Sequence, residues 1–200
     1  MSARQDYFEQ LYQDRADPWQ VRSSWYEQRK RAVLLAALRQ ESYRSAFEPG
    51  CGTGELTAAL APRCASVLAC DIAPRAVALA SARTAAWPHV QVQALSLPAQ
   101  WPASTRDAYD LIVVSELAYY LEAADLARFV RLCVASLAPA GELVVCHWRH
   151  DFHDRLHSTD TIHAVYDGQP TLARLGRHED PDFLLQAWRR GPACPAKEAA

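Results

Sequence analysis

The stretch Ala46-Phe-Glu-Pro-Gly-Cys-Gly-Thr-Gly-Glu-Leu-Thr57 is the strongest indication of fold in this chain of 200 residues. A short apolar strand carries the carboxylate of Glu48 at its end, and Gly50, Gly52 and Gly54 then turn the chain into a helix. Glycine is favoured where the backbone takes a positive φ or passes close to a ligand. Open α/β sheets bind nucleoside cofactors at such a first strand-to-helix turn. The stretch therefore predicts an α/β sheet with a nucleoside site.

The residues around the glycines indicate which nucleoside binds. The nicotinamide fingerprint G-x-G-x-x-G holds a pyrophosphate at a helix N-terminus, whereas the spacing here is G-x-G-x-G and Glu55 follows. Glu48 would repel a pyrophosphate but suits a ligand that has cationic groups and no phosphate. S-adenosylmethionine (SAM), with its ammonium and sulfonium, is such a ligand. The string E-P-G-C-G-T-G resembles the SAM-binding motif of class I methyltransferases, and the alternative is an ordinary tight turn.

Length and composition set the outer limits of the prediction. Half of the residues are apolar, which is enough for one well-buried α/β domain. We expect this domain to span residues 1–190, with an N-terminal helical cap at 1–40 and a flexible tail at 191–200. The net charge is −2, so the charge balance gives no reason to expect nucleic-acid binding.

Cysteine spacing and hydropathy indicate the compartment. The six cysteines are scattered and never spaced C-x-x-C, which favours a reduced protein. No apolar run approaches the ~20 residues that cross a bilayer, and the N-terminus lacks the apolar core of a signal peptide. We expect a soluble, cytoplasmic protein with no membrane partner, either a monomer or a weak dimer.

Strands and helices alternate along the rest of the chain. Apolar or alternating runs predict strands at 66–71, 89–94, 109–116 and 142–146, followed by a hairpin of strands at 171–178 and 183–189. Helices are expected between them, including 73–86 and 123–137, the latter stopped by Ala138-Pro-Ala-Gly141. This order matches the class I methyltransferase fold: a Rossmann-like, seven-stranded, mostly parallel sheet with helices on both faces and a C-terminal antiparallel hairpin.

Two strand ends are candidates for cofactor contacts. Asp71 lies about twenty residues after the glycines, where a βαβ unit places a carboxylate on the cofactor ribose; a helix N-cap is the alternative. Ser96 stands where many SAM enzymes carry an aspartate that faces the adenine amino group, and a hydroxyl is a weaker acceptor. Other residues predicted to line the cofactor site are Cys51, Ile72, Leu97 and Ser115.

The N-terminal region combines aromatic and basic residues. Ser24 and Glu27 have the spacing of a capping box that opens a helix. The basic residues of this helix are expected on a solvated face, except that Arg29 is a candidate for the SAM carboxylate. Exposed aromatic side chains beside cations often cover a ligand, so the aromatic residues Trp19, Trp25 and Tyr26 are expected to close over the site.

The acceptor side of the site is expected at two further strand ends. Glu116, Tyr119 and Tyr120 follow the buried strand at 109–116, where parallel sheets bind ligands; for the tyrosines the alternative is packing under the next helix. His147 and His150 follow the strand at 142–146, and His147 is a candidate general base. Four histidines in this region raise a metal hypothesis, but their spacing fits no metal motif, so no metal is expected.

Several local strings point to one family. They are Tyr7–Tyr12 with Asp17-Pro-Trp19, Ser24-Trp-Tyr-Glu27 with Arg29-Lys-Arg31, Ser115-Glu116 with Tyr119-Tyr-Leu121, and His147-Trp-Arg-His150. Together they resemble the NodS-like family of nodulation-type N-methyltransferases over residues 7–190. The family's named member methylates the free amine of a deacetylated glucosamine in a lipo-chitooligosaccharide.

The resemblance implies an enzyme that transfers methyl from SAM and releases S-adenosylhomocysteine (SAH). The implied acceptor is an amine of a small molecule or oligosaccharide. Two alternatives stay open, because a fold does not fix the chemistry of its site. One is an O-methyltransferase acting on a small metabolite, and the other is a SAM-binding module without catalysis.

Overall fold

The computed structural model of the chain describes residues 3–102 and 108–191. Its strands are β1 (Ala46–Pro49), β2 (Val67–Asp71), β3 (Val90–Ala94), β4 (Tyr109–Ser115), β5 (Leu137–Trp148), β6 (Leu172–Glu179) and β7 (Phe183–Arg190). Its α-helices are α1 (Ala3–Asp14), α2 (Trp25–Ala37), α3 (Glu55–Leu60), α4 (Pro74–Arg83), α5 (Ala123–Ser136) and α6 (Thr159–Asp167). Two short 3-10 turns, η1 (Ala61–Arg63) and η2 (Ala118–Tyr120), complete the regular elements.

The seven strands form one sheet in the order β3-β2-β1-β4-β5-β7-β6. The first five are parallel to one another, and β7 runs antiparallel to both β5 and β6. The predicted fold class, including the C-terminal hairpin, is confirmed. Strand order reverses between β1 and β4, and α/β sheets bind ligands at the carboxyl ends of strands beside such a switch point.

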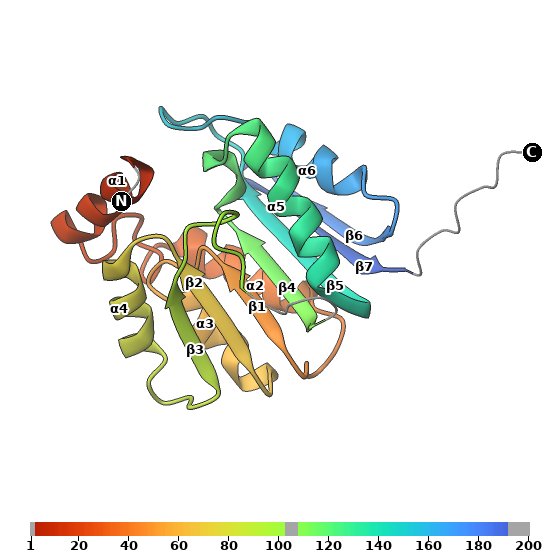
Figure 1. Cartoon of the computed structure of the whole chain (residues 1–200), viewed down its shortest axis with the longest axis horizontal. Coiled ribbons are helices and arrows are strands. Elements are labelled where there is room, and N and C mark those ends of the chain that lie inside the picture. The colour runs from red at the N-terminus through yellow and green to blue at the C-terminus, as the bar shows by residue number, and fades with distance from the viewer. Residues whose placement is uncertain (1–2, 103–107, 192–200) are drawn as a thin grey trace, which may run out of the picture.

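Helices cover both faces of the sheet (Figure 1). On one face α5 and α6 bury large side chains such as Phe129 and Tyr166 against the strands. On the other face α2 and α3 bury Leu34 and Leu60, and α4 extends this layer over β2 and β3. Figure 1 shows α5 and α6 in front of the sheet, with α2 and α3 behind it. The strands β1 and β4 are buried between these layers, as continuous apolar runs predict.

The junction between α5 and β5 differs from the prediction. A helix stop at Ala138–Gly141 with a strand from 142 was expected, but β5 begins at Leu137. Tyr109 pairs with Leu137 while Leu111 pairs with Glu142, so the register between β4 and β5 shifts at this point. A Cβ on Gly141 would lie 3.0 Å from the Tyr109 carbonyl oxygen. The glycine therefore permits a close approach of two strands, whereas the helix already ends at Ser136.

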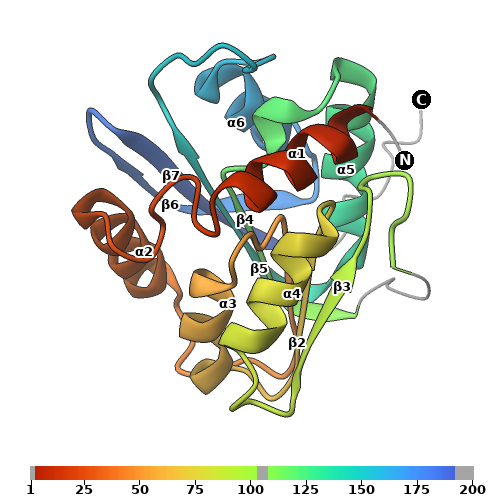
Figure 2. The same cartoon turned by 90° about the vertical axis from the view of Figure 1, so that its left-hand side faces the viewer.

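The N-terminal helices form where the sequence predicts them, but one cap differs. Ser24 is the N-cap residue of α2, yet its side chain makes no cap hydrogen bond. The Glu27 carboxylate instead accepts a hydrogen bond from Lys30 Nζ at 2.8 Å, so the predicted capping box is not formed. Figure 2 shows α1 lying across one end of the sheet beside α4, where Tyr12 packs on alanines of α4.

None of the helices in residues 3–102 and 108–191 is long and apolar enough to cross a membrane. Of the predicted tail at 191–200, residues 192–200 lie outside the described residues.

Candidate active site

A cavity of about 680 Å³ lies at the carboxyl ends of the parallel strands. The ends of β1, β2, β4 and β5 form its floor, and side chains of α1 and α2 form its roof. Its volume falls in the range of about 300–1,000 Å³ that is typical of small-molecule sites. Thirteen predicted site residues line it: Trp19, Tyr26, Glu48, Gly50, Cys51, Gly52, Asp71, Ile72, Leu97, Ser115, Glu116, Tyr119 and Tyr120.

The glycine-rich turn forms one wall of this cavity. Gly50 and Gly52 have φ values of +75° and +54°, a region that residues with a Cβ seldom adopt. The N–H of Gly52 donates to Asp71 Oδ2 at 3.0 Å, and the N–H of Ala73 donates to Oδ1 at 3.0 Å. Asp71 thus supports the start of α4 and also faces the cavity, so its two predicted roles are geometrically compatible.

Glu48 is a buried carboxyl group without a full set of partners. Its Oε2 atom is buried and has no hydrogen-bond partner among the described residues. Burial raises its pKa to about 8, against a smaller opposing effect of Thr57. A cation that entered the cavity would stabilise the ionised form of this group. The site therefore fits a ligand that carries positive charge, as the sequence predicts.

Two residues predicted to touch the cofactor lie outside the cavity wall. A Cβ on Gly54 would stand 2.8 Å from Ala80 Cα, so this glycine allows α3 and α4 to pack closely. Along the extended segment after β3, Leu95 and Leu97 line the cavity whereas Ser96 between them does not. The N–H of Ser96 bonds to the Gln100 side chain at 2.7 Å. The structure therefore does not bring Gly54 and Ser96 to the cavity wall with the other predicted cofactor residues.

The Glu116 side chain accepts four hydrogen bonds in the cavity. Its Oε1 accepts from Lys30 Nζ at 2.6 Å, and its Oε2 accepts from the Trp148 N–H at 3.0 Å and from the Tyr119 hydroxyl. The Tyr26 hydroxyl lies 3.5 Å from Oε1. Glu116 has a φ of +55°, a costly conformation that persists where the surroundings enforce it. The network therefore fixes a carboxylate at the end of β4.

Lys30 is a site residue that the sequence did not reveal. It was expected on a solvated helix face, yet it is only 3% exposed and lines the cavity. Burial alone would lower the pKa of its ammonium, but the carboxylates of Glu116 and Glu27 raise it. Its ammonium also lies 5.0 Å from the centre of the Tyr26 ring. The scarcity of lysine was the available signal, because Lys30 and Lys197 are the only lysines in the chain.

The other N-terminal candidates divide between cavity and surface. Trp19 and Tyr26 line the cavity, whereas Trp25 is 74% exposed. Arg29 forms an ion pair with Asp180 and lies 5.3 Å over the Phe183 ring. Helical rotation places residues 25 and 29 on one side and residues 26 and 30 on the other. The structure therefore does not bring Trp25 and Arg29, predicted to cover the site and to bind the SAM carboxylate, to the cavity wall.

Aromatic rings cover the outer part of the cavity. Phe8 and Tyr120 have ring centroids 5.0 Å apart, and Phe152 lies 4.9 Å from Tyr119 and 5.7 Å from Tyr120. Both Phe8 and Phe152 line the cavity, together with Tyr7, although none of these three was predicted to bind a ligand. For α1, the helical spacing of the apolar residues Tyr7, Phe8, Leu11 and Tyr12 was the available signal. Flat apolar walls of this kind suit a ring-containing ligand.

Neither predicted histidine reaches the cavity. His147 is fully buried; its Nε2 accepts from the Ala118 N–H at 3.2 Å and its Nδ1 lies 3.2 Å from His163 Nε2. His163 Nδ1 in turn lies 2.6 Å from Gln186 Oε1. His150 is exposed and pairs with Asp182. The prediction of His147 and His150 as catalytic groups is corrected, because strand pleating turns His147 toward α6.

The two buried histidines make stability depend on pH. Burial lowers the pKa of His163 to about 4 and lowers that of His147 as well. Between pH 6.5 and 4 the unfolded chain binds protons that the folded chain does not, so acid destabilises the fold. From His163 alone we expect the free energy of unfolding to fall by about 2 kcal/mol from pH 7 to pH 5. Urea unfolding of the wild type and His163→Gln at both pH values measures this. If both proteins lose the same free energy of unfolding between pH 7 and pH 5, His163 is not the cause of the pH dependence.

No three His, Cys, Asp or Glu side chains in the described ranges, 3–102 and 108–191, are grouped so that they could hold a metal ion. The five described cysteines are buried free thiols.

A family model described as Nodulation protein S (NodS) matches residues 4–167, which extend from α1 to the end of α6. The chain belongs to the NodS family. Its resemblance to this family, inferred from local strings, is thus confirmed. Nodulation protein S of Bradyrhizobium diazoefficiens is 34% identical over 130 residues and that of Sinorhizobium fredii is 35% identical over 130 residues. Each match includes 64% of this chain but only 61% and 59%, respectively, of the relative's own length.

Solved structures extend the comparison. The N-methyltransferase NodS from Bradyrhizobium japonicum WM9, in complex with SAH, has a TM-score of 0.80 and 26% identity, covering 91% of this chain and 97% of that chain. A candidate methyltransferase from Pseudomonas syringae is 46% identical with a TM-score of 0.72, covering 84% of this chain and all of that one. The chain therefore shares its fold with the NodS enzyme.

Proposed function

We propose that the protein is a SAM-dependent methyltransferase that methylates an amine of a small molecule or saccharide. The observation that carries this proposal is that Glu48, Asp71 and Glu116 face one cavity in a member of the NodS family. The similar NodS from B. japonicum was crystallised with SAH and is described as an N-methyltransferase. The proposal extends that activity to this chain.

The donor half of the cavity fits SAM. Gly50 and Gly52 allow the ligand to approach the backbone closely, and Asp71 can accept hydrogen bonds from ribose hydroxyls. Leu95 and Leu97 offer apolar contact to a base, and the partnerless oxygen of Glu48 can accept from an ammonium group. When bound, SAM supplies an electrophilic methyl group on a sulfonium.

The acceptor half must bind an amine and expose its lone pair. We assign Glu116 to this task because its carboxylate lies in the cavity and is held by Lys30, Tyr119 and the Trp148 N–H. A fixed negative charge attracts a protonated amine and can take up its proton, directly or through one water. With SAM bound, the neutral nitrogen would be able to take the methyl group and leave SAH, and the aromatic walls would keep water away from it.

Cofactor binding is tested by thermal unfolding in the presence of SAH. We expect SAH at about 100 times its Kd to stabilise the wild type by about 2.7 kcal/mol. Asp71→Ala should lose much of this shift, measured against its own melting point without ligand, because ribose hydrogen bonds are lost. The matched control is Asp110→Ala, which removes a carboxylate that pairs with Arg44 outside the cavity. A wild type that SAH does not stabilise overturns the cofactor assignment.

Acceptor chemistry is tested by turnover with radiolabelled SAM. We expect labelled product with deacetylated chitooligosaccharides or simple amines and none with matched hydroxyl compounds. Product with hydroxyl acceptors alone would replace the proposal by an O-methyltransferase. Binding of SAH without transfer to any acceptor would leave a SAM-binding module.

A further inference from the structure

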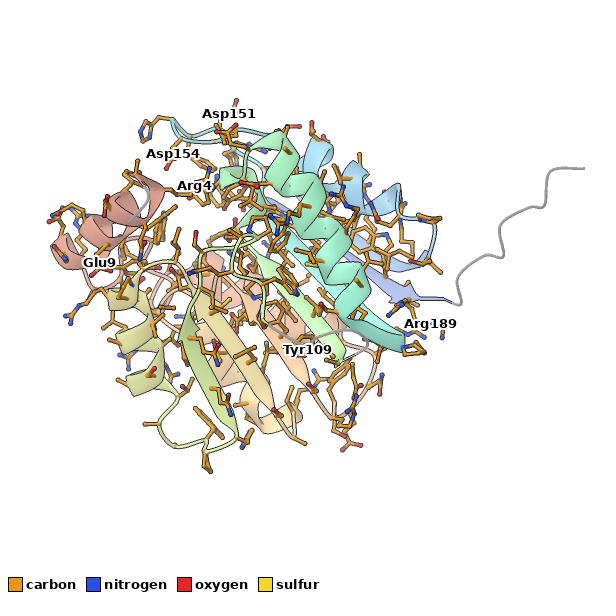
Figure 3. All side chains as sticks on the ribbon, viewed as in Figure 1. Arg4, Glu9, Tyr109, Asp151, Asp154 and Arg189 are labelled. Atoms are coloured by element: carbon orange, nitrogen blue, oxygen red, sulfur yellow. The ribbon has the colours of Figure 1, made fainter. Side chains whose placement is uncertain are left out.

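The segment 149–158 joins β5 to α6 without helix or strand, yet it supplies part of the cavity wall. Phe152, His153 and Asp154 of this segment line the cavity opposite α1. Figure 3 shows the side chains of Arg4 on α1 and Asp154 extending into the space between α1 and this segment. An irregular segment that forms a binding wall needs side-chain bonds to keep its shape.

Arg155 provides these bonds from within the segment. Its side chain is only 6% exposed. Its guanidinium donates to the carbonyl oxygens of Arg149 at 2.9 Å, His150 at 2.8 Å and His157 at 2.8 Å. It also donates to the Thr159 hydroxyl at 2.8 Å. One side chain thus ties the start and end of the segment to the first residue of α6, which five donors in a rigid fork make possible.

The same segment is attached to the turn that carries Glu116. The Leu156 N–H donates to the Tyr119 carbonyl oxygen at 2.9 Å. The Phe152 ring packs against the rings of Tyr119 and Tyr120, and the Tyr119 hydroxyl donates to Glu116. A shift of the segment would therefore move the aromatic wall relative to the Glu116 carboxylate.

We propose that Arg155 is a positioning residue for the methyl acceptor, acting by holding Phe152 and Asp154 in the cavity wall beside Glu116. This inference rests on the proposed function. Arg155 itself is absent from the cavity lining, so it acts through the residues it positions. All hydrogen bonds described for the Arg155 guanidinium go to residues 149–159. None of them reaches the glycine turn or Asp71, which form the cofactor side of the cavity.

The test compares Arg155→Lys with a matched control, Arg63→Lys. Arg63 binds backbone carbonyls in a similar way, at Leu35, Leu38, Gln40 and Glu41, but lies outside the cavity lining. In Arg155→Lys we expect kcat/KM for a chitooligosaccharide amine to fall on the order of 10- to 100-fold, mostly through KM. The SAH dissociation constant should stay unchanged, and amide hydrogen exchange of 149–158 should become faster. Arg63→Lys should leave KM unchanged.

A second variant guards against general loss of structure. Thr159→Val removes one partner of Arg155, together with the hydrogen bond from the Thr159 hydroxyl to the Trp148 carbonyl, and should raise KM in the same direction by a smaller factor. An unchanged KM in Arg155→Lys despite faster exchange overturns the proposal, and so does an equal rise of KM in Arg63→Lys. If the wild type binds SAH but methylates no amine, the proposed function fails and the acceptor role of Arg155 fails with it. If the wild type methylates the amine and Arg155→Lys has the same KM as the wild type, the positioning role of Arg155 is rejected while the proposed function stands.

Discussion

Replacing Glu116 with glutamine is expected to lower the rate of methyl transfer by about 100-fold or more, with little change in SAH binding. Both carboxylate oxygens already accept hydrogen bonds, from Lys30 on one side and from Tyr119 and the Trp148 N–H on the other. An amide presents a donor on one side, which would face a donor of the protein. It also removes the negative charge that attracts and deprotonates the amine.

Single-turnover transfer from labelled SAM, at saturating acceptor, measures this loss without a contribution from product release. Glu142→Gln is the matched control, because Glu142 is a buried carboxylate that accepts from the Tyr43 hydroxyl at 2.7 Å and lies outside the cavity. This control should lower stability while the folded protein keeps its transfer rate. A Glu116→Gln enzyme that transfers methyl at the wild-type rate would remove Glu116 from the mechanism.

Replacing Lys30 with methionine is expected to destabilise the fold by about 3 kcal/mol, because it removes a buried ammonium from two partly buried carboxylates, whose side chains are 13% and 25% exposed. The Lys30 ammonium lies 2.6 Å from Glu116 and 2.8 Å from Glu27. Methionine preserves much of the side-chain volume, so packing contributes little to the loss. Transfer should also slow, since Glu116 loses a group that fixes it.

Urea unfolding measures the cost, with Arg44→Met as the control. Arg44 also pairs with a carboxylate, that of Asp110, but its side chain is 68% exposed, and exposed pairs contribute only about 0–1 kcal/mol. The double variant Lys30→Met with Glu116→Gln should recover part of the stability lost in Lys30→Met, because the stranded charge is removed as well. If Lys30→Met and Arg44→Met lower the free energy of unfolding by the same amount, the ion pairs of Lys30 contribute no more to stability than a surface pair.

Local patterns were sufficient to predict the fold. The apolar strands at 67–71 and 109–115, and the hairpin of β6 and β7, lie within a residue or two of their predicted limits. The glycine turn and Asp71 were also predicted as one site, because a βαβ unit fixes their spacing and relative position. The predicted oligomeric state and compartment stay predictions.

The acceptor side could not be predicted as fully, because its contacts join distant parts of the sequence. Lys30 and Glu116 are 86 residues apart, and no local pattern indicates that α2 buries its lysine on a strand end. His147 was correctly predicted at a strand end, but the pleat of the strand directs its ring into the core, where it bonds to the Ala118 N–H. The next residue, Trp148, bonds to Glu116 through its backbone N–H. Side-chain direction at a strand end depends on register, which the sequence alone does not specify.

The two halves of the cavity are built from different kinds of structure. The glycine turn and Asp71 belong to the central sheet, whereas Phe8 and Phe152 come from α1 and from the segment 149–158, at the margins of the fold. Insertions and substitutions are tolerated far better in such marginal segments than in a sheet. An ancestral enzyme of this architecture could therefore acquire new substrates by changing those two segments while its donor site stayed intact. Substitutions in α1 and in the segment 149–158 would thus change the acceptor side of the cavity without changing the glycine turn or Asp71.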